Sequence, residues 1–334
     1  INYARKLGII RKTIYGVDFQ EIAIEISRLR AFLSIIVDEK VLDDKPNRNI
    51  LPLPNLEFKF IVANSLIKLN YDIKFSDFFY HKFQKFIPQL EEIRNQFFDT
   101  TNTDKNELKS RFTSLTNKIK DEILKHNDHT HRPMLDVMLK FAEWNPFENT
   151  PADWFDPEWM FGVTDGFDIV IGNPPYVSTK GVSDDIKKIL MQQFGFADDL
   201  YNHFYFKGIQ LLKEKGILTY ISSKTFWTIQ TKKNLRELLL KNKLLQLVDT
   251  ANPFESAMVD TCITIVQKDK SSNYEISFID ISNGWDEKQE YRVKDEVYKN
   301  VVNNVFFEPN ELNIKIYEQI GKKLKPLMER WWDK

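Results

Sequence analysis

The sequence predicts an α/β fold in which helices flank an open sheet and a helical hairpin is inserted into the chain. Three observations support this prediction. Residues Phe167–Ile171 form a short, β-branched apolar run that is typical of a strand buried on both faces. Residues 13–36 join a strand-like run to an amphipathic helix. Between residues 79 and 123, apolar side chains recur in alternating steps of three and four, as they do in packed helices.

The composition allows a packed core. The chain has 334 residues, 42% hydrophobic and 28% charged, enough for one large domain or two to three small ones. Its formal net charge of −1 argues against a uniformly basic nucleic-acid binder, although a local basic groove needs only a few Lys and Arg. Cys262 is the single cysteine, so an internal disulfide is excluded and a reducing compartment fits. No apolar run is long enough to span a membrane. Because the first residue is Ile1 and not Met, we expect the chain to be an excerpt from a longer protein.

The first predicted strand covers residues 13–18 and ends on Asp18. The helix that follows has one apolar face, formed by Ile22, Ile26, Leu29, Leu33 and Ile36. Rossmann-type folds present a carboxylate to a ribose at the end of such a strand. An aspartate that only caps the helix, or is solvated, gives the same pattern, so the role of Asp18 stays open at this point.

The second predicted strand, residues 58–62, leads to Asn64. An asparagine side chain at a strand end can hydrogen-bond an adenine edge or a ribose, and it can equally form a turn. The spacing alone does not decide between these two roles.

The heptad-like seam of the next segment predicts an inserted helical hairpin. Its first helix carries Phe79, Phe83, Phe86, Leu90, Ile93 and Phe97. After a break at residues 100–104, its second helix carries Leu108, Phe112, Leu115, Ile119 and Ile123. Its mixed charges indicate a solvated face, with a DNA or partner contact as the alternative.

Three histidines follow the hairpin, at positions 126, 129 and 131. They could bind a metal, but they have no cysteine partner and no helical pair spaced four residues apart. The spacing therefore favours a polar loop.

The strand at residues 167–171 breaks at Gly172 into a segment of unusual chemistry. Asn173 offers a side-chain oxygen, and Pro174 offers a carbonyl without an N–H of its own, while Pro175 stiffens the backbone. Tyr176 offers a flat ring with a polar tip. We expect a rigid rim at the carboxyl end of a strand, where open α/β sheets place their ligands. A tight proline turn at a strand end is the structural alternative.

The remainder of the chain predicts a polar loop, further strands and three helices. Residues 178–199, which include Lys180, would form a mobile lid or a DNA-facing loop. A helix at 201–212 would end at Gly216, with further helices at 235–240 and 310–328. Strands are expected at 217–222, 244–249, 260–267 and, at the sheet edge, 274–281.

Three segments in chain order carry a family resemblance: Ile14–Asp18 (Ile-Tyr-Gly-Val-Asp), Val62–Leu66 (Val-Ala-Asn-Ser-Leu) and Ile171–Tyr176 (Ile-Gly-Asn-Pro-Pro-Tyr). The sequence resembles S-adenosylmethionine-dependent DNA adenine-N6 methyltransferases of the gamma class. It looks most like the methyltransferase region of single-chain, type IIG restriction-modification enzymes. The later segments Leu200–Ile221 and Asn234–Leu239 match as well, and the helical insertion also fits.

The resemblance implies a Rossmann-like methyltransferase sheet with flanking helices and the inserted hairpin. Residues 1–74 would be the cofactor-binding part and 75–150 the helical insertion. Residues 151–270 would be the catalytic part and 271–334 an extension towards a target-recognition domain. The family's glycine-rich first motif is absent, so we expect it upstream of Ile1, with its strand filling a gap between the strands of residues 14–18 and 167–171.

The resemblance also implies a reaction and its residues. The enzyme would transfer a methyl group from S-adenosylmethionine to the N6 amino group of a flipped-out adenine in double-stranded DNA, in the bacterial or archaeal cytoplasm. The catalytic residues would be Asn173, Pro174, Pro175 and Tyr176. The cofactor would be bound by Asp18, at its ribose, by Asn64, at its adenine, and by Phe19, Ser65 and Asn173. The substrate would be contacted by Tyr176, Lys180, Phe226, Trp227, Lys232 and Arg236.

The resemblance also leaves rivals. A protein-glutamine or RNA-guanine methyltransferase shares the Asn-Pro-Pro-Tyr rim, but usually has no long helical insertion before it. A non-catalytic DNA-binding fragment would explain the missing first motif. An N4-cytosine methyltransferase more often has Ser before the two prolines. The sequence does not specify the recognition sequence, a nuclease activity or the oligomeric state.

Overall fold

The computed structural model describes residues 2–37, 42–44, 48, 54–69, 85–100, 102–125, 132–148, 150–253 and 259–332. The chain divides into two compact units, residues 1–164 and 165–334, which are treated separately below. The three clustered histidines, and Phe79 and Phe83 of the predicted hairpin, lie outside the described residues. Within the described part of the chain, no helix is long and apolar enough to cross a lipid bilayer.

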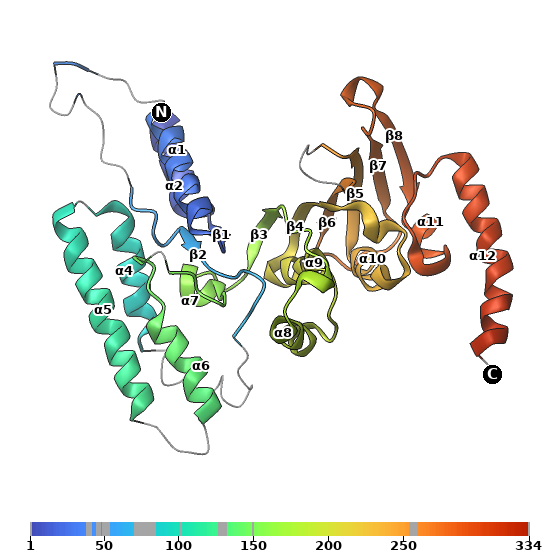
Figure 1. Ribbon diagram of the computed structural model, residues 1–334. Helices are drawn as coiled ribbons and strands as arrows, with labels where there is room; N and C mark the ends of the chain where they lie inside the picture. The colour runs from blue at the N-terminus through green and yellow to red at the C-terminus, as the bar shows by residue number, and fades with distance from the viewer. Residues whose placement is uncertain are drawn as a thin grey trace. The chain divides into compact units, whose positions relative to one another are not determined.

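The first unit combines a short parallel sheet with helices (Figure 1). Its elements are α1 (Asn2–Thr13), β1 (Gly16–Asp18), α2 (Glu21–Ile36), β2 (Phe60–Val62), α4 (Ile87–Asp99), α5 (Asn102–Leu124), α6 (Arg132–Glu143) and α7 (Pro157–Phe161). Strand β1 pairs with β2 so that Gly16 lies opposite Phe60 and Asp18 lies opposite Val62. The parallel register places the carboxyl ends of both predicted strands side by side.

The inserted hairpin is confirmed, and a third helix joins it. The residues of the seam in α4 and α5 that the structure describes are buried, as their heptad spacing predicts. Helix α6 packs beside α5 (Figure 1). Helix α6 begins at Arg132, directly after the three clustered histidines, and the heptad-like pattern did not predict it.

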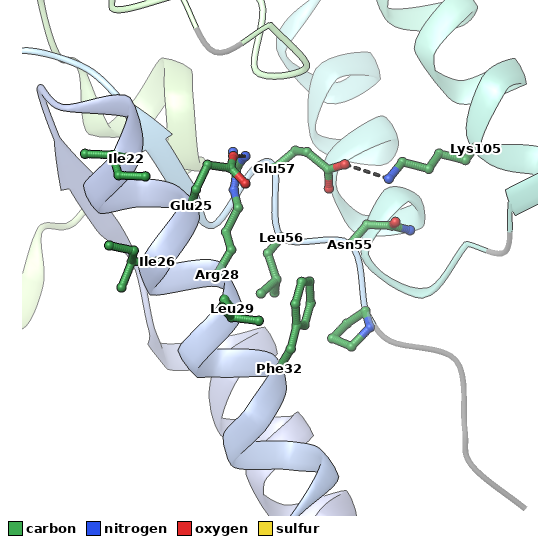
Figure 2. Close-up of a pocket in the computed structure, with 11 residues that line it drawn as sticks. Ile22, Glu25, Ile26, Arg28, Leu29, Phe32, Asn55, Leu56, Glu57 and Lys105 are labelled. Carbon is green, nitrogen blue, oxygen red and sulfur yellow. Dashed lines mark hydrogen bonds and ion pairs between the residues drawn. The ribbon is translucent and has the colours of Figure 1, made fainter. Parts of the chain in front are cut away.

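The apolar face predicted for α2 is not the face that packs inward. Ile24 and Ile35 are buried against α1 and β2, whereas the predicted face, residues 22, 26, 29 and 33, is exposed. Figure 2 shows three of these side chains lining an open pocket beside the segment that precedes β2. Helix α2 is therefore apolar on two sides, and periodicity alone could not tell which side faces the core.

The second unit is built on a six-stranded mixed sheet (Figure 1). Its strands are β3 (Phe167–Gly172), β4 (Leu212–Ser223), β5 (Lys243–Ala251), β6 (Thr261–Gln267), β7 (Glu275–Asp280) and β8 (Gln289–Lys294). They lie in the order β3-β4-β6-β5-β7-β8. Strand β4 is parallel to β3, and β6 is antiparallel to both β4 and β5, so β3, β4 and β5 end at the same edge of the sheet.

The helices of this unit are mostly short. They are α8 (Asp184–Phe194), α9 (Leu200–Leu211), α10 (Lys233–Lys241), α11 (Glu296–Lys299) and α12 (Glu311–Trp332). Five 3₁₀ turns accompany them: η3 (Thr179–Gly181), η4 (Lys224–Trp227), η5 (Gln230–Lys232), η6 (Trp285–Glu287) and η7 (Val302–Asn304).

Three local predictions need correction in this unit. The segment predicted as a polar loop contains α8, whose first turn is capped by the Ser183 hydroxyl accepting from the Ile186 N–H. Strand β7 is internal, because β8 pairs beyond it. Gly216 lies within β4 and does not cap α9, which ends at Leu211.

Candidate functional site

The Asn-Pro-Pro-Tyr segment follows the last residue of β3, as the sequence predicts. Gly172 is the final residue of the strand and pairs with Tyr220 of β4. A Cβ atom on Gly172 would lie 3.1 Å from the Tyr220 ring, so a glycine suits this close approach. The segment therefore emerges at the sheet edge where β3, β4 and β5 all end, the edge at which α/β proteins bind ligands.

Strand β3 is not buried on both faces. Ile169 is 63% exposed and Ile171 is 79% exposed, whereas Val170 packs against the core. Side chains alternate between the two faces of a strand, so Ile169 and Ile171 share one face, which the described residues leave largely uncovered. Strand β3 is also an edge strand and, among the described residues, pairs only with β4. The expectation of a strand covered on both faces is wrong for this structure, and an apolar face of β3 is open.

The four residues of the rim differ in exposure. Asn173 and Pro175 are exposed, Pro174 is buried and Tyr176 is half-buried. The Asn173 side chain makes no hydrogen bond to any described residue, so its amide is uncommitted. The Tyr176 hydroxyl is buried and has no hydrogen-bond partner among the described residues. Burial raises the pKa of Tyr176, and the nearby Cys262 thiol raises it further. The phenol is therefore neutral, and its ring is the part left to meet a ligand.

Asp199 fixes the chain just after the rim. Its Oδ1 accepts hydrogen bonds from the Thr179 N–H at 2.9 Å and from the Thr179 hydroxyl at 3.2 Å. The next residue, Leu200, donates its N–H to the Val177 carbonyl at 3.0 Å. These bonds tie residues 177–179 to the start of α9 and so limit how far Tyr176 can move.

Lys232 lies in an ion network with two carboxylates. Its side chain is 5% exposed, and its Nζ contacts Asp198 Oδ1 and, at 2.7 Å, Asp199 Oδ2. Burial alone would raise the pKa of Asp199, but hydrogen bonds from Lys232 and Thr179 outweigh it and lower that pKa. Asn202 donates to the second oxygen of Asp198 at 2.7 Å. The Lys232 charge is thus neutralised inside the protein, which argues against a direct contact with DNA.

Three further residues expected at the substrate are also buried. Arg236 is 0% exposed and donates to the carbonyls of Phe226, Ile229 and Asn303. Phe226 and Trp227 are core side chains. Arg236 thus links the carbonyls of two 3₁₀ turns and a loop, and the Ile229 carbonyl also accepts from the Lys232 N–H at 3.1 Å. The position of Arg236 on an amphipathic helix did not reveal this role. The burial of Arg236, Phe226 and Trp227 corrects the expectation that these side chains contact the substrate directly. Lys180, by contrast, is exposed in η3, four residues after Tyr176.

Four of the five residues expected at the cofactor lie at the carboxyl ends of β1 and β2 in the first unit, and the fifth, Asn173, belongs to the rim in the second unit. Asp18 is exposed, and its Oδ1 accepts from the Gln20 N–H at 2.8 Å. Phe19 is 57% exposed beside it. Asn64 is half-buried, and its side-chain oxygen accepts from the Leu66 N–H at 3.2 Å. Ser65 is half-buried as well.

This donor and acceptor set fits a nucleoside. The carboxylate of Asp18 is held by the backbone yet stays accessible, as a ribose diol requires. Asp18 and Asn64 each also accept a hydrogen bond from a backbone N–H two residues further along the chain. Asn64 therefore does form a turn, and this does not exclude a contact with an adenine edge or a ribose. No group of three or more His, Cys, Asp or Glu within the described part of the chain could hold a metal ion.

Sequence reasoning missed two residues that shape the rim. Asp198 and Asp199 precede α9, and an acidic pair before a helix reads as a simple cap. The side chain of Asp199 does not cap α9, because it turns to Thr179 and Lys232. Lys224, which pairs with Asp249 at 2.5 Å at the ends of β4 and β5, was also missed. Of these residues only Lys224 directly follows a strand, so no common sequence signal marks them.

The sequence also matches a known family. A family model described as Eco57I restriction-modification methylase matches residues 12–255, and this range includes β1, β2 and the rim after β3. The chain belongs to this family.

Curated relatives of the chain are much longer than it is. A protein of Methanocaldococcus jannaschii, provisionally named a type II restriction enzyme and methyltransferase, is 26% identical over 323 residues, which are 80% of this chain and 26% of that protein. The type II methyltransferase M.BstVI of Geobacillus stearothermophilus is 33% identical over 159 residues, which are 42% of this chain and 28% of that protein. The chain thus spans about a quarter of the length of these two relatives.

Among solved structures, the type IIG restriction endonuclease BpuSI is 20% identical, with a TM-score of 0.33 over 49% of this chain and 23% of that chain. The methyltransferase subunit of a type I restriction-modification system from Streptococcus thermophilus is 19% identical, with a TM-score of 0.32 over 56% and 39%. TM-scores of this size carry no argument about function.

Proposed function

We propose that the protein transfers a methyl group from S-adenosylmethionine to the N6 amino group of an adenine in double-stranded DNA, as part of a restriction-modification system. The observation that supports this most is the position of residues 173–176 at the carboxyl end of β3, inside the range matched by the family.

Asn173 and Pro174 supply two acceptors to the amino group. An adenine amino group is a poor nucleophile, because its lone pair is delocalised into the ring. The Asn173 side-chain oxygen and the Pro174 carbonyl each accept one N–H, which directs the lone pair towards the methyl donor. Fixed dipoles of this kind need no reorganisation during the reaction, and each is worth about 2.7–4 kcal/mol. The proton leaves after the nitrogen has become cationic, so the rim needs no general base.

Tyr176 stacks on the target base, which must leave the duplex at a cost of a few kcal/mol. Its buried hydroxyl leaves the ring face as the part that meets a base. Lys180 contacts a backbone phosphate in this proposal, and its exposure in η3 supports that role. Lys232 and Arg236 stabilise this region through a buried ion pair and a buried hydrogen bond, and they do not touch DNA.

Asp18, Phe19, Asn64 and Ser65 hold the cofactor. Asp18 accepts from the ribose hydroxyls, and Asn64 meets the adenine edge. When bound, S-adenosylmethionine supplies the electrophilic methyl group. The protein's own contribution is to bind and orient the two reactants, which accounts for a large share of the rate advantage.

The experiment that tests this function offers the full-length protein three acceptors. The protein is incubated with S-adenosylmethionine labelled in its methyl group and with unmethylated double-stranded DNA, RNA or a protein extract. We expect label in DNA only. Label in RNA or protein and none in DNA would favour the rival methyltransferases that share the Asn-Pro-Pro-Tyr rim. Absence of label everywhere, together with no cofactor binding by calorimetry, would favour a non-catalytic role.

A further inference from the structure

A second pocket in the first unit lies at the opposite ends of β1 and β2 from Asp18 and Asn64. Its volume is about 320 Å³. Tyr15 and Lys59 line it, and each precedes the first pair of the ladder, Gly16 with Phe60. The Gly16 N–H donates to the Lys59 carbonyl at 2.8 Å, which fixes the two side chains against each other. The length of β1 separates this pocket from the residues proposed to hold the cofactor.

Four cationic side chains line this pocket: Arg11, Lys12, Lys59 and Arg94. The Lys59 Nζ lies 3.9 Å from the centroid of the Tyr15 ring. Arg11 pairs with Asp99 at 2.6 Å, whereas neither lysine pairs with a carboxylate of any described residue. The pocket thus gathers positive charge that the described part of the chain does not balance.

Arg94 has partners of its own. Its Nη1 donates to the carbonyls of Glu158 and Trp159 at 3.0 and 3.1 Å. The carboxylates of Glu91 and Glu158 also interact electrostatically with its guanidinium. Arg94 therefore supports the end of α7 and forms the floor of the pocket. The uncompensated charge is that of the two lysines.

Lys59 is held in an unfavourable setting for a cation. Burial lowers the pKa of Lys59 to about 8, and repulsion from Arg11 adds to this. The negative carboxyl end of the α1 dipole stabilises the charges of Arg11 and Lys12, which lie in the last turn of that helix. Lys59 precedes β2 and is not part of that helix end. Charged groups that are half-buried beside a like charge usually meet an opposite charge.

We propose that this pocket binds a phosphate group, with Lys59, Arg11 and Lys12 as its cationic contacts. The two lysines offer point charges, and Arg11 adds the guanidinium donors that its ion pair with Asp99 leaves unused, which together match phosphate oxygens. Aromatic side chains, among them Phe58, Phe97 and Phe161, form the rest of its lining. A backbone phosphate of DNA and a small free phosphate share this chemistry. The site is independent of the methyl-transfer residues.

The test compares Lys59→Met with a matched control, Lys109→Met. Lys109 is also half-buried in the first unit, over the Phe147 ring at 5.2 Å, and does not line the pocket. The first measurement is the melting temperature in inorganic phosphate and in chloride at equal ionic strength. The second is DNA affinity as a function of salt concentration. Lys59→Gln repeats both if Lys59→Met fails to fold.

If free phosphate is the ligand, phosphate will raise the melting temperature of the wild type and of Lys109→Met, but not that of Lys59→Met. If a DNA phosphate is the ligand, the slope of log affinity against log salt will fall by about 0.9 in Lys59→Met alone. Equal behaviour of all three proteins in both measurements would overturn the proposal. If the protein binds no DNA, the phosphate measurement alone decides. Neither measurement depends on methyl transfer.

Discussion

Tyr176 shows how a single side chain can be buried at one end and available at the other. Its hydroxyl has lost water without gaining a partner among the described residues, while its ring is only half-buried. A buried hydroxyl without a hydrogen bond costs stability, so removing it should recover that cost. The ring alone is what base stacking requires.

We therefore expect Tyr176→Phe to keep methyl transfer and to raise the free energy of unfolding by about 1 kcal/mol. Tyr176→Ala removes the stacking ring, worth about 1–3 kcal/mol per base, so methyl transfer should fall roughly 5- to 150-fold. Urea unfolding and initial rates on DNA measure the two effects. Loss of activity in Tyr176→Phe would mean that the hydroxyl, and not the ring, matters.

Lys232 makes a second prediction at this scale. Replacing it with Met leaves Asp198 and Asp199 without their shared cation, and breaking a buried pair costs about 3 kcal/mol. Lys187→Met is the control, because Lys187 pairs with Asp184 on the surface of α8. It should change the free energy of unfolding by less than about 1 kcal/mol. Equal destabilisation of both variants, measured in urea, would refute the buried network.

His203 on α9 links stability to pH. Burial lowers the pKa of His203 to about 4, below the ordinary value near 6.5, although the nearby Asp198 carboxylate opposes this. The unfolded chain therefore takes up the proton first. Stability should be full above about pH 6.5 and fall as the pH drops towards 4, by up to about 3 kcal/mol. Urea titrations across this range on wild type and His203→Gln should show a smaller fall in the variant. Parallel curves would assign the acid sensitivity to other groups.

At the scale of elements, the contact of β3 with β4 depends on Gly216. A Cβ atom there would lie 2.9 Å from the carbonyl oxygens of Lys213 and Phe167. The same glycine in the sequence predicts a helix cap, because a Lys-Gly pair after a helix is a common stop signal. The glycine is needed instead where β4 bulges towards β3.

Two glycine substitutions test this packing with opposite signs. Gly216→Ala should lower the free energy of unfolding by about 1–3 kcal/mol, since backbone must move. Gly8→Ala lies in α1 with nothing within 4 Å and should raise it by about 0.5–1 kcal/mol. Chemical denaturation of each variant gives both values. A neutral Gly216→Ala would show that β3 does not approach this closely.

Periodicity predicted the elements well where one face alone is apolar. The seam of α4 and α5 is buried as expected, because polar residues fill the other faces. The same reasoning was wrong for helix α2, because its buried residues Ile24 and Ile35 lie on the side opposite the predicted apolar face. Arg236 and Lys232 show another limit of prediction from sequence. A charged residue is expected at the protein surface, and only the tertiary fold reveals the carbonyl or carboxylate partners that allow it to be buried.

At the scale of the whole molecule, chain order carried more information than any single motif. Asp18 is the last residue of β1, Asn64 and Asn173 come shortly after β2 and β3, and the sequence predicted all three placements at the carboxyl ends of parallel strands. Their roles remain predictions. The first two lie in the first unit and Asn173 lies in the second. The edge position of β3 agrees with the gap expected beside residues 167–171, whereas the exposure of Ile169 and Ile171 was not predicted.

The most direct test of the account identifies the methylated base. DNA treated with the full-length protein and S-adenosylmethionine is digested to nucleosides and analysed by mass spectrometry, beside an Asn173→Ala variant whose folding is checked by its melting temperature. We expect N6-methyladenine with the wild type and a loss of about 10²–10³-fold in the variant, since one fixed acceptor is removed. Methylcytosine with the wild type, or undiminished N6-methyladenine with a folded Asn173→Ala, would contradict the account.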